Sequence, residues 1–199
     1  MKGERCACKT KCSSSLAIVR ERLTTTDYRS RVTGHAVVPL SKIVSGGQTG
    51  VDRGALDAAL EAGFPCGGWS PPARLAEDGP IPARYPLAEL EHGGYSERTL
   101  KNVVDSDGTV IFFNRELEGG TRQTHDYCVE QAKPVLLIDA ARTSHIEAAD
   151  KTRAFIARGQ IAILNVAGPR ASKWPQALSY ARSVISLVLA RAEASGNRK

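Results

Sequence analysis

Short apolar segments alternate with longer amphipathic segments along most of this chain, and this alternation restricts the fold more than any other feature of the sequence. Five apolar runs are typical of strands, at residues 42–45, 65–69, 109–113, 134–139 and 161–166. Five segments with helical periodicity follow them, at residues 51–62, 96–105, 120–132, 145–158 and 173–192. Alternation of this kind produces parallel sheets with helices on both faces. The sequence therefore predicts an α/β fold, a Rossmann-like three-layer domain with a mostly parallel sheet of five or more strands.

The charge of the chain is concentrated at its two ends. Within the formal net charge of +6, residues 1–40 hold eight basic and three acidic residues, and residues 191–199 hold three basic and one acidic. Residues 41–190 are left with a net charge of −1, so a basic face for nucleic acid is not expected in the domain. We expect a flexible basic extension at 1–40, one ligand-binding domain at 41–192 and a disordered tail from residue 193 to 199.

The sequence points to the cytoplasm and to no dedicated metal site. It has neither an apolar run of the roughly 20 residues that a membrane span needs nor the apolar core of a secretory signal. Three of the five cysteines, Cys6, Cys8 and Cys12, lie in the extension without a nearby histidine to complete a zinc site, and we interpret them as incidental thiols. Cys66 and Cys128 lie in apolar surroundings and are typical of small core residues.

The segment VSGGQTGVDRGALDAAL, residues 44–60, joins the first predicted strand to the first predicted helix. Its glycines match neither the Walker A pattern, which ends in Gly-Lys-Ser/Thr, nor the dinucleotide pattern G-x-G-x-x-G. Glycines at a strand end still let a ligand approach the backbone, and the next helix points free N–H groups at the same place. The candidate ligand-binding residues are Gly46, Gly47, Gln48, Thr49 and Gly50, with Asp52 and Arg53 either on the rim of the site or on the plain surface.

Two later turns repeat this arrangement. Gly119, Gly120 and Thr121 open a predicted helix that carries Thr124, and Gly168 with Arg170 follows the last predicted strand, ahead of Ser172. The carboxyl ends of parallel strands lie along one edge of a sheet, where α/β proteins bind ligands. Three glycine turns with hydroxyl or cationic neighbours therefore indicate one shared anion-binding pocket at that edge.

The proline-rich segment, residues 70–95, interrupts the alternation with five prolines. Long loops inside compact domains are usually functional, and this one brings charged groups to the predicted edge. They are Arg74, Glu77 and Asp78, and the next predicted helix adds Arg98, Thr99, Asn102 and Asp105. Arginine suits phosphate or carboxylate, and carboxylates can accept ribose hydroxyls, bind a metal or act as acid or base. If the protein is an enzyme, Glu77 and Asp78 are the candidate catalytic residues.

In their order along the chain, these motifs resemble the putative molybdenum carrier family, which is the circularly permuted YpsA-like branch of the SLOG superfamily. The resemblance covers about residues 42–190 and is carried by GGQTGVDRGALDAAL, GGWSPPARLAEDGPIPARYPLAE, YSERTLKNVVDSDGTVIF, GGT with KPVLLID, and LNVAGPR. Serial agreement of this kind is more specific than any single glycine turn. There is one departure: after Gly-Trp the family commonly continues Cys-Pro-Lys-Gly-Arg, whereas Trp69 is followed here by Ser70-Pro71-Pro72-Ala73-Arg74.

The resemblance implies a Rossmann-like SLOG-type domain whose pocket binds a phosphorylated, nucleotide-like ligand through the candidate residues named above. In the carriers this ligand is the molybdenum cofactor (molybdopterin), a pterin dithiolene bearing a phosphate, which is stored or delivered to molybdoenzymes rather than transformed. Two alternatives stay open. One is a phosphoribohydrolase-like enzyme that cleaves an N-glycosidic bond, although the P-G-G-x-G-T-x-x-E motif of those relatives is absent; the other is a sensor of a nucleotide signal. The apolar residues at 184–189 indicate a buried last helix or a contact in a homo-oligomer.

Overall fold

The computed structural model describes residues 38–196, with side chains described as far as Ala190. The predicted N-terminal extension, apart from its last three residues, lies outside the described residues. The same holds for Cys6, Cys8 and Cys12 and for the last three residues of the chain.

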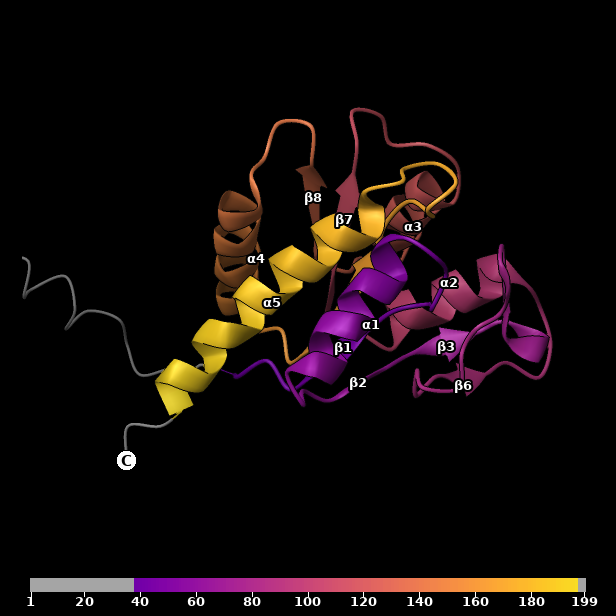
Figure 1. Ribbon diagram of the computed structural model, residues 1–199, viewed down its shortest axis with the longest axis horizontal. Helices are drawn as coiled ribbons and strands as arrows, with labels where there is room; N and C mark the ends of the chain where they lie inside the picture. The colour runs from indigo at the N-terminus through magenta and orange to yellow at the C-terminus, as the bar shows by residue number, and fades with distance from the viewer. Residues whose placement is uncertain (1–37, 197–199) are drawn as a thin grey trace, which may run out of the picture. The chain divides into compact units, whose positions relative to one another are not determined.

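A five-stranded sheet forms the centre of the domain, with the strand order β2-β1-β9-β7-β8 (Figure 1). Its strands are β1 (Lys42–Val44), β2 (Cys66–Gly67), β7 (Gly108–Phe113), β8 (Val135–Asp139) and β9 (Ile163–Ala167). All neighbouring pairs are parallel. The predicted α/β fold with a mostly parallel five-stranded sheet is therefore confirmed.

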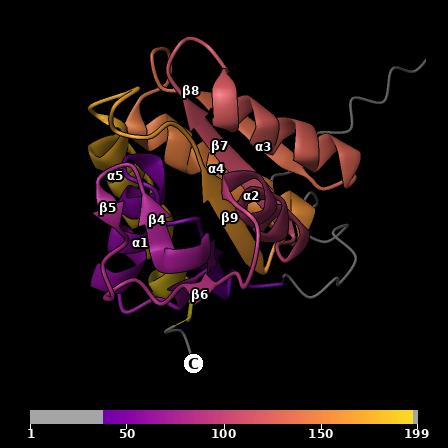
Figure 2. The same cartoon turned by 90° about the vertical axis from the view of Figure 1, so that its right-hand side faces the viewer.

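Helices cover both faces of this sheet. The elements α1 (Val51–Glu61), α4 (His145–Gly159) and α5 (Ala177–Gly196) share the main hydrophobic core with one face. On the other side lie α2 (Tyr95–Val104) and α3 (Gly119–Glu130), and Figure 2 shows α3 across the sheet from α1 and α5. Among the described residues, no helix combines the length and the apolar character that crossing a membrane requires.

The helix α5 packs closely on α1. A Cβ added to Gly54 in α1 would lie 2.3 Å from the carbonyl oxygen of Leu178, so the two helices approach at a glycine. Four large apolar residues of α5 are at most 3% exposed: Val184, Ile185, Val188 and Leu189. Burial inside the chain thus accounts for the apolar character of these four residues.

The strand β9 comes last along the chain but lies in the middle of the sheet. The chain moves outward from β1 to β2 and from β7 to β8, and β9 then fills the gap between β1 and β7. The helices α1 and α3, which follow β1 and β7, leave toward opposite faces. A crevice therefore forms at the carboxyl ends of β1, β9 and β7, the place where such sheets bind ligands.

Two predicted elements differ from the structure. The apolar run at 65–69 forms two strands, because Gly68 turns the chain with a φ of 130°; β3 (Trp69–Ser70) then leaves the main sheet and pairs with β6 (Ala88–Glu89). The last helix begins at residue 177 rather than 173, since residues 171–176 form turns around Pro175, whose ring lacks the N–H that a helix interior needs.

The proline-rich segment contains only short elements besides β3 and β6: the 3-10 turn η1 (Pro72–Arg74), β4 (Leu75–Ala76) and β5 (Gly79–Pro80). A small second core attaches it to α1, formed by Leu56, Ile81, Tyr85 and Leu87. The segment is therefore packed rather than loosely attached.

Arg74 organises this segment from within. Its guanidinium donates hydrogen bonds of 2.9–3.1 Å to the carbonyl oxygens of Ile81, Pro82, Tyr85 and Leu87. One arginine thus connects four backbone carbonyl groups of this loop, two of which, Pro82 O and Tyr85 O, also accept a backbone N–H.

We predict that Ala73→Gly stabilises the protein by about 0.5–1 kcal/mol. Ala73 has a φ of 56°, and the left-handed region costs a side chain about 1–2 kcal/mol, part of which the greater backbone entropy of unfolded glycine offsets. The measurement is the midpoint of urea unfolding at unchanged m. Ala83→Gly is the matched control, since Ala83 lies in the same segment but has no positive φ; equal gains in both variants would contradict the prediction.

Candidate functional site

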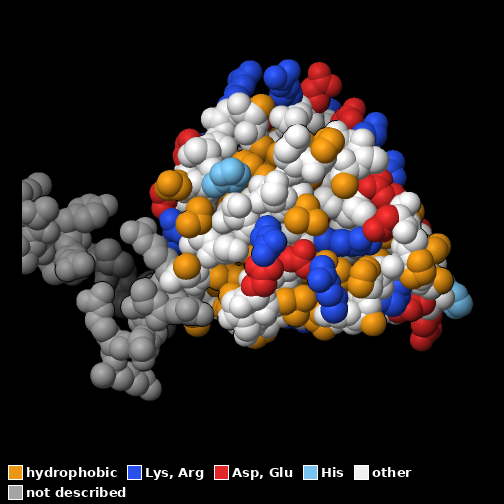
Figure 3. Space-filling view, in the orientation of Figure 1, with side chains coloured by type: hydrophobic (Ala, Val, Ile, Leu, Met, Phe, Trp, Pro, Cys, Tyr) orange, Lys and Arg blue, Asp and Glu red, His pale blue; other side chains and the backbone are white. Residues whose placement is uncertain are grey.

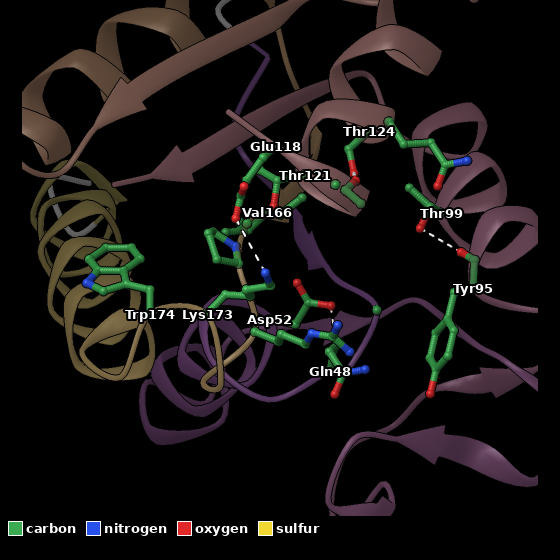
Figure 4. Close-up of a pocket in the computed structure, with 18 of the residues that line it drawn as sticks. Gln48, Asp52, Tyr95, Thr99, Glu118, Thr121, Thr124, Val166, Lys173 and Trp174 are labelled. Atoms are coloured by element: carbon green, nitrogen blue, oxygen red, sulfur yellow. Dashed lines mark hydrogen bonds and ion pairs between the residues drawn. The ribbon is translucent and has the colours of Figure 1, made fainter. Parts of the chain in front are cut away.

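A cavity of about 540 Å³ opens at the carboxyl edge of the sheet. Its walls come from the turn after β1 (residues 45–50), α2, the start of α3 with the residues before it, and the loop after β9 (residues 168–176), as Figure 4 shows. Small-molecule sites have volumes of roughly 300–1,000 Å³. The cavity is therefore large enough for a nucleotide-sized ligand.

The cavity brings together residues from all three glycine turns and from α2. Of the candidates from the sequence, those that line it are Gly46, Gln48, Asp52, Arg98, Thr99, Asn102, Gly119, Gly120, Thr121, Gly168 and Arg170. The candidates that do not line it are Gly47, Thr49, Gly50, Arg53, Arg74, Glu77, Asp78 and Asp105. Most of the second group is engaged in contacts inside the protein.

The turn after β1 is shaped by its packing on the loop after β9. Gly50 has a φ of 80°, which favours glycine, and a Cβ there would lie 2.4 Å from the carbonyl oxygen of Pro169. The N–H of Val51 donates to the same oxygen at 3.2 Å. Part of the amino terminus of α1 is therefore closed by the protein itself.

A buried ion pair forms the floor of the cavity. Arg98 Nη1 lies 3.1 Å from Asp52 Oδ2, and the two side chains are 12% and 6% exposed. The N–H of Gln48 also donates to Asp52 Oδ2, at 3.3 Å. Burial raises the pKa of Asp52, and the charge of Arg98 and the Gln48 N–H oppose that shift.

Arg98 reaches this floor because Gly46 has no side chain. A Cβ at Gly46 would lie 1.3 Å from Arg98 Nη1. The remaining guanidinium atom Nε is buried and has no hydrogen-bond partner within the described part of the chain. A buried donor without an acceptor costs about 1–3 kcal/mol, so this N–H is a group that a bound molecule could satisfy.

The amino terminus of α3 is open toward the cavity. Its N-cap residue, Glu118, makes no side-chain capping bond, and a Cβ on Gly119 or Gly120 would meet no atom within 4 Å. Thr121 is only 7% exposed and lines the cavity, and its hydroxyl has no hydrogen-bond partner among residues 38–196 (Figure 4). Free helix N–H groups and the positive end of the helix dipole favour an anion here.

Glu77 lies behind the first glycine turn and joins three segments. It accepts hydrogen bonds from the hydroxyls of Thr49 and Ser172 and from Ser172 N at 3.2 Å, and Arg170 Nε lies 3.5 Å away. Burial raises the pKa of Glu77, but the hydrogen bonds from Ser172 and Thr49 and the charge of Arg170 outweigh it and hold the pKa below its ordinary value of 4.5. Glu77 thus ties the proline-rich segment to the loops after β1 and β9.

Asp78 forms a two-pronged ion pair with Arg53. The distances are 2.6 Å and 2.7 Å, and Arg53 Nε also donates to the carbonyl oxygen of Gly47 at 3.1 Å. The hydrogen bonds from Arg53 lower the pKa of Asp78. Both carboxylates that the sequence offered as catalytic candidates are therefore held by internal partners outside the cavity.

On α2, polar residues attach the helix to β3. The side-chain amide of Asn102 exchanges two hydrogen bonds with the backbone of Trp69, at 2.9 Å and 3.2 Å. Asp105 accepts from Trp69 Nε1 at 2.8 Å, and Thr99 donates to the carbonyl oxygen of Tyr95 at 2.7 Å. The Thr99 bond lies within α2, whereas the contacts of Asn102 and Asp105 with Trp69 fix the position of the helix, from which Arg98 extends to the floor of the cavity.

Cationic groups lie around the mouth of the cavity. Arg170 is half-exposed, and Lys173 Nζ lies 3.7 Å from Glu118 Oε1 with both side chains more than half exposed. Exposed pairs of this kind are weak. Arg115 also lines the mouth; its backbone has a φ of 68° and its N–H donates to Asp139 Oδ1 at 2.9 Å.

Several lining residues were missed by reasoning from the sequence: Tyr95, Asn114, Arg115, Glu116, Glu118, Gln123, Asn165, Lys173 and Trp174. Asn165 carried a usable signal, because an amide side chain inside the apolar run IAILNV indicates a polar contact at that position. It is 3% exposed and donates to Thr109 Oγ1 at 3.2 Å. Lys173 and Trp174 were not recognised as lining residues, because the last helix was expected to start at residue 173.

A family model described as the circularly permutated YpsA SLOG family matches residues 43–189, which includes almost every element above. The chain belongs to this family. The crystal structure at 1.45 Å of a putative molybdenum carrier protein from Syntrophus aciditrophicus SB is similar to it, with a TM-score of 0.73 and 43% sequence identity over 75% of this chain and 95% of that one. The search of curated proteins gave no match. The family suggested by the motifs is therefore confirmed.

In this SLOG protein, the departure from the Cys-Pro-Lys-Gly-Arg pattern lies away from the cavity. Ser70 is fully buried and donates to the carbonyl oxygen of Ala88 at 3.3 Å, and neither it nor Pro72 lines the cavity. The described cysteines, Cys66 and Cys128, do not line it either. Within residues 38–196, no group of His, Cys, Asp and Glu side chains is placed to hold a metal ion.

We predict that Glu77→Gln destabilises this SLOG domain by about 1–2 kcal/mol near pH 7, because glutamine loses the charge facing Arg170 and one of the two acceptor oxygens. The folded-state pKa of Glu77 lies below 4.5, so its stabilisation is present above that value and is lost as the pH falls through the folded pKa. Urea unfolding at several pH values should show the difference shrinking in acid. Glu91→Gln, on an exposed side chain of the same segment, is the control. An equal loss of stability in this variant would contradict the role of Glu77 in joining the three segments.

Proposed function

We propose that the cavity binds a phosphorylated, nucleotide-like ligand and holds it without turnover, as a carrier or store of molybdenum cofactor. The observation that carries this proposal is the open amino terminus of α3, which faces a cavity of ligand size. The printed name of the similar protein from Syntrophus, a putative molybdenum carrier, supports the same reading.

The start of α3 suits a phosphate group. Gly119 and Gly120 leave room for oxygen atoms to approach the backbone, since a Cβ on either residue would enter open space. Thr121 adds a hydroxyl that has no partner among the described residues, and Arg170 and Lys173 at the mouth add positive charge. Backbone N–H groups at a helix start together with nearby cations are a common phosphate site.

The other walls suit the ring system of such a ligand. Tyr95 presents an aromatic ring that is 47% exposed, and the amide of Gln123 lies on the same side of the cavity. With no described cysteine in the cavity, we expect the protein to hold the cargo by its phosphate and ring rather than through a bond to its metal.

Binding without turnover is favoured over a hydrolase for a specific reason. Glu77 and Asp78 are engaged by Thr49, Ser172 and Arg53 outside the cavity, where they do not face a bound glycosidic bond. A cytoplasmic location and delivery to molybdoenzymes, possible partners expected from the resemblance, belong to the same proposal, as does any homo-oligomer.

Gentle purification followed by mass spectrometry of the retained small molecule and metal analysis tests this function. We expect a pterin with a phosphate and, when the cargo is complete, molybdenum. Release of free base from a nucleoside monophosphate would support the hydrolase instead. Retained AMP or ADP-ribose without molybdenum would rule out the carrier while leaving phosphate binding intact.

We predict that Gly120→Asp lowers the retained ligand at least about tenfold, because a carboxylate at the start of α3 competes with the phosphate for the same N–H groups. The fold should survive, since an acidic residue stabilises a helix amino terminus by about 0.3–1 kcal/mol and the Cβ has free space. Ligand per protein and the melting temperature are measured together. Gly120→Ala is the matched control and should retain the ligand; full retention by Gly120→Asp would contradict the phosphate site.

A further inference from the structure

The floor of the cavity offers a specific pattern of acceptors and donors. The hydrogen bonds that Asp52 accepts from Arg98 and from Gln48 N both reach Oδ2, at 3.1 Å and 3.3 Å. Figure 4 shows the other carboxylate oxygen turned away from the ion pair, toward the open space that Thr121 and Lys173 border. The nearby Ser45 hydroxyl donates its proton to Val166 O at 2.6 Å. Asp52 therefore presents a second acceptor oxygen to the cavity.

Two further donors belong to residues that line the same cavity. Arg98 Nε is buried without an acceptor among the described residues. The amide of Gln48 is fixed in orientation because its Oε1 accepts from Thr49 N and from Glu77 N, both at 3.0 Å. Its Nε2 is then the free end, and it makes no hydrogen bond within the part of the chain that the structure describes. The cavity thus offers one carboxylate oxygen as an acceptor and two N–H donors that need an acceptor.

We infer that this floor recognises the 2-amino-4-oxopyrimidine edge, which guanine and pterins share. The inference rests on the proposed function, since it concerns the ring of a ligand whose phosphate lies at α3. That edge presents a carbonyl oxygen, then a ring N–H, then an exocyclic amine. Asp52 accepts from the N–H and the amine, while Arg98 and Gln48 donate to the carbonyl oxygen, a pairing that arginine also makes with guanine in nucleic acids.

Adenine does not fit the same floor. Its ring nitrogen at this position carries a lone pair, which would face the carboxylate of Asp52, and its amine would face the donors of Arg98 and Gln48. A ligand that leaves buried polar groups of a site unpaired is rejected strongly. The floor therefore selects the guanine and pterin class against the adenine class.

Isothermal titration with four probes tests the inference: GMP, AMP, xanthosine monophosphate (XMP) and neopterin monophosphate. The wild-type chain should bind GMP and neopterin monophosphate at least about tenfold more tightly than AMP, a difference that one good hydrogen bond supplies. The ratio of GMP to neopterin affinity, together with the fluorescence of the retained ligand, tells which of the two rings the protein carries.

Asp52→Asn provides a change of preference that a merely structural residue would not give. The donors Arg98 Nη1 and Gln48 N keep the amide oxygen in the place of Oδ2, so the NH₂ group faces the cavity. This donor repels the 2-amino group of GMP but pairs with the 2-oxo group of XMP. We expect GMP affinity to fall, and the ratio of XMP to GMP affinity to rise, about tenfold or more.

Gln48→Glu gives a second test if Asp52→Asn does not fold. It keeps the acceptor for Thr49 N and Glu77 N but replaces the free donor by an oxygen. The affinity for GMP should therefore fall, and the affinity for AMP relative to GMP should rise. Equal affinity of the wild type for GMP and AMP, or an unchanged preference in both variants, would overturn the inference. If all nucleotides bind alike and Gly120→Asp abolishes their binding, the phosphate site stands and only the ring selectivity fails. Failure of all four probes to bind the wild type would overturn both.

Discussion

The contact between the turn after β1 and the loop after β9 holds the site together. Gly50 touches the carbonyl oxygen of Pro169, Val51 donates to that oxygen, and a Cβ on Gly168 would lie 2.5 Å from Phe112 O and 2.6 Å from Val51 Cγ2. Three strand ends from distant parts of the chain meet there, and the glycines let them approach closely. This close backbone packing fixes the distance between α1 and α3 and so defines the crevice in which the cavity lies.

The charges near this crevice divide into two groups by what they contact. Arg53, Arg74, Glu77 and Asp78 satisfy internal partners and give the proline-rich segment a fixed position. Arg98, by contrast, enters the cavity with one N–H unpaired. Arginine suits both tasks because its planar fork makes several directed hydrogen bonds at once. Residue type alone therefore does not separate a group that binds a ligand from one that holds a loop.

Sequence reasoning succeeded where local periodicity and strand-end geometry decide the outcome. The alternation of apolar runs predicted the sheet, and the glycine turns predicted which edge holds the cavity. It failed where the decisive partner is distant in sequence: Arg53 pairs with Asp78 over 25 residues and Asp52 with Arg98 over 46. Nothing in the local spacing shows that Arg74 donates its hydrogen bonds to four carbonyl groups of the protein, or that Gly68 turns the chain out of the main sheet. Those outcomes depend on tertiary packing, which one sequence does not display.

The central position of β9 has a consequence for how the protein is made. Its pairing with β1 joins residues more than 100 positions apart, and such non-local pairing slows folding. A nascent chain that has emerged only as far as α4 lacks both the middle strand and the loop that closes the cavity. Chains fold as domains while synthesis proceeds from the amino terminus, so the cavity is complete only after β9 and the loop that follows it have been synthesised. Completion of the cavity therefore follows synthesis of nearly the whole domain.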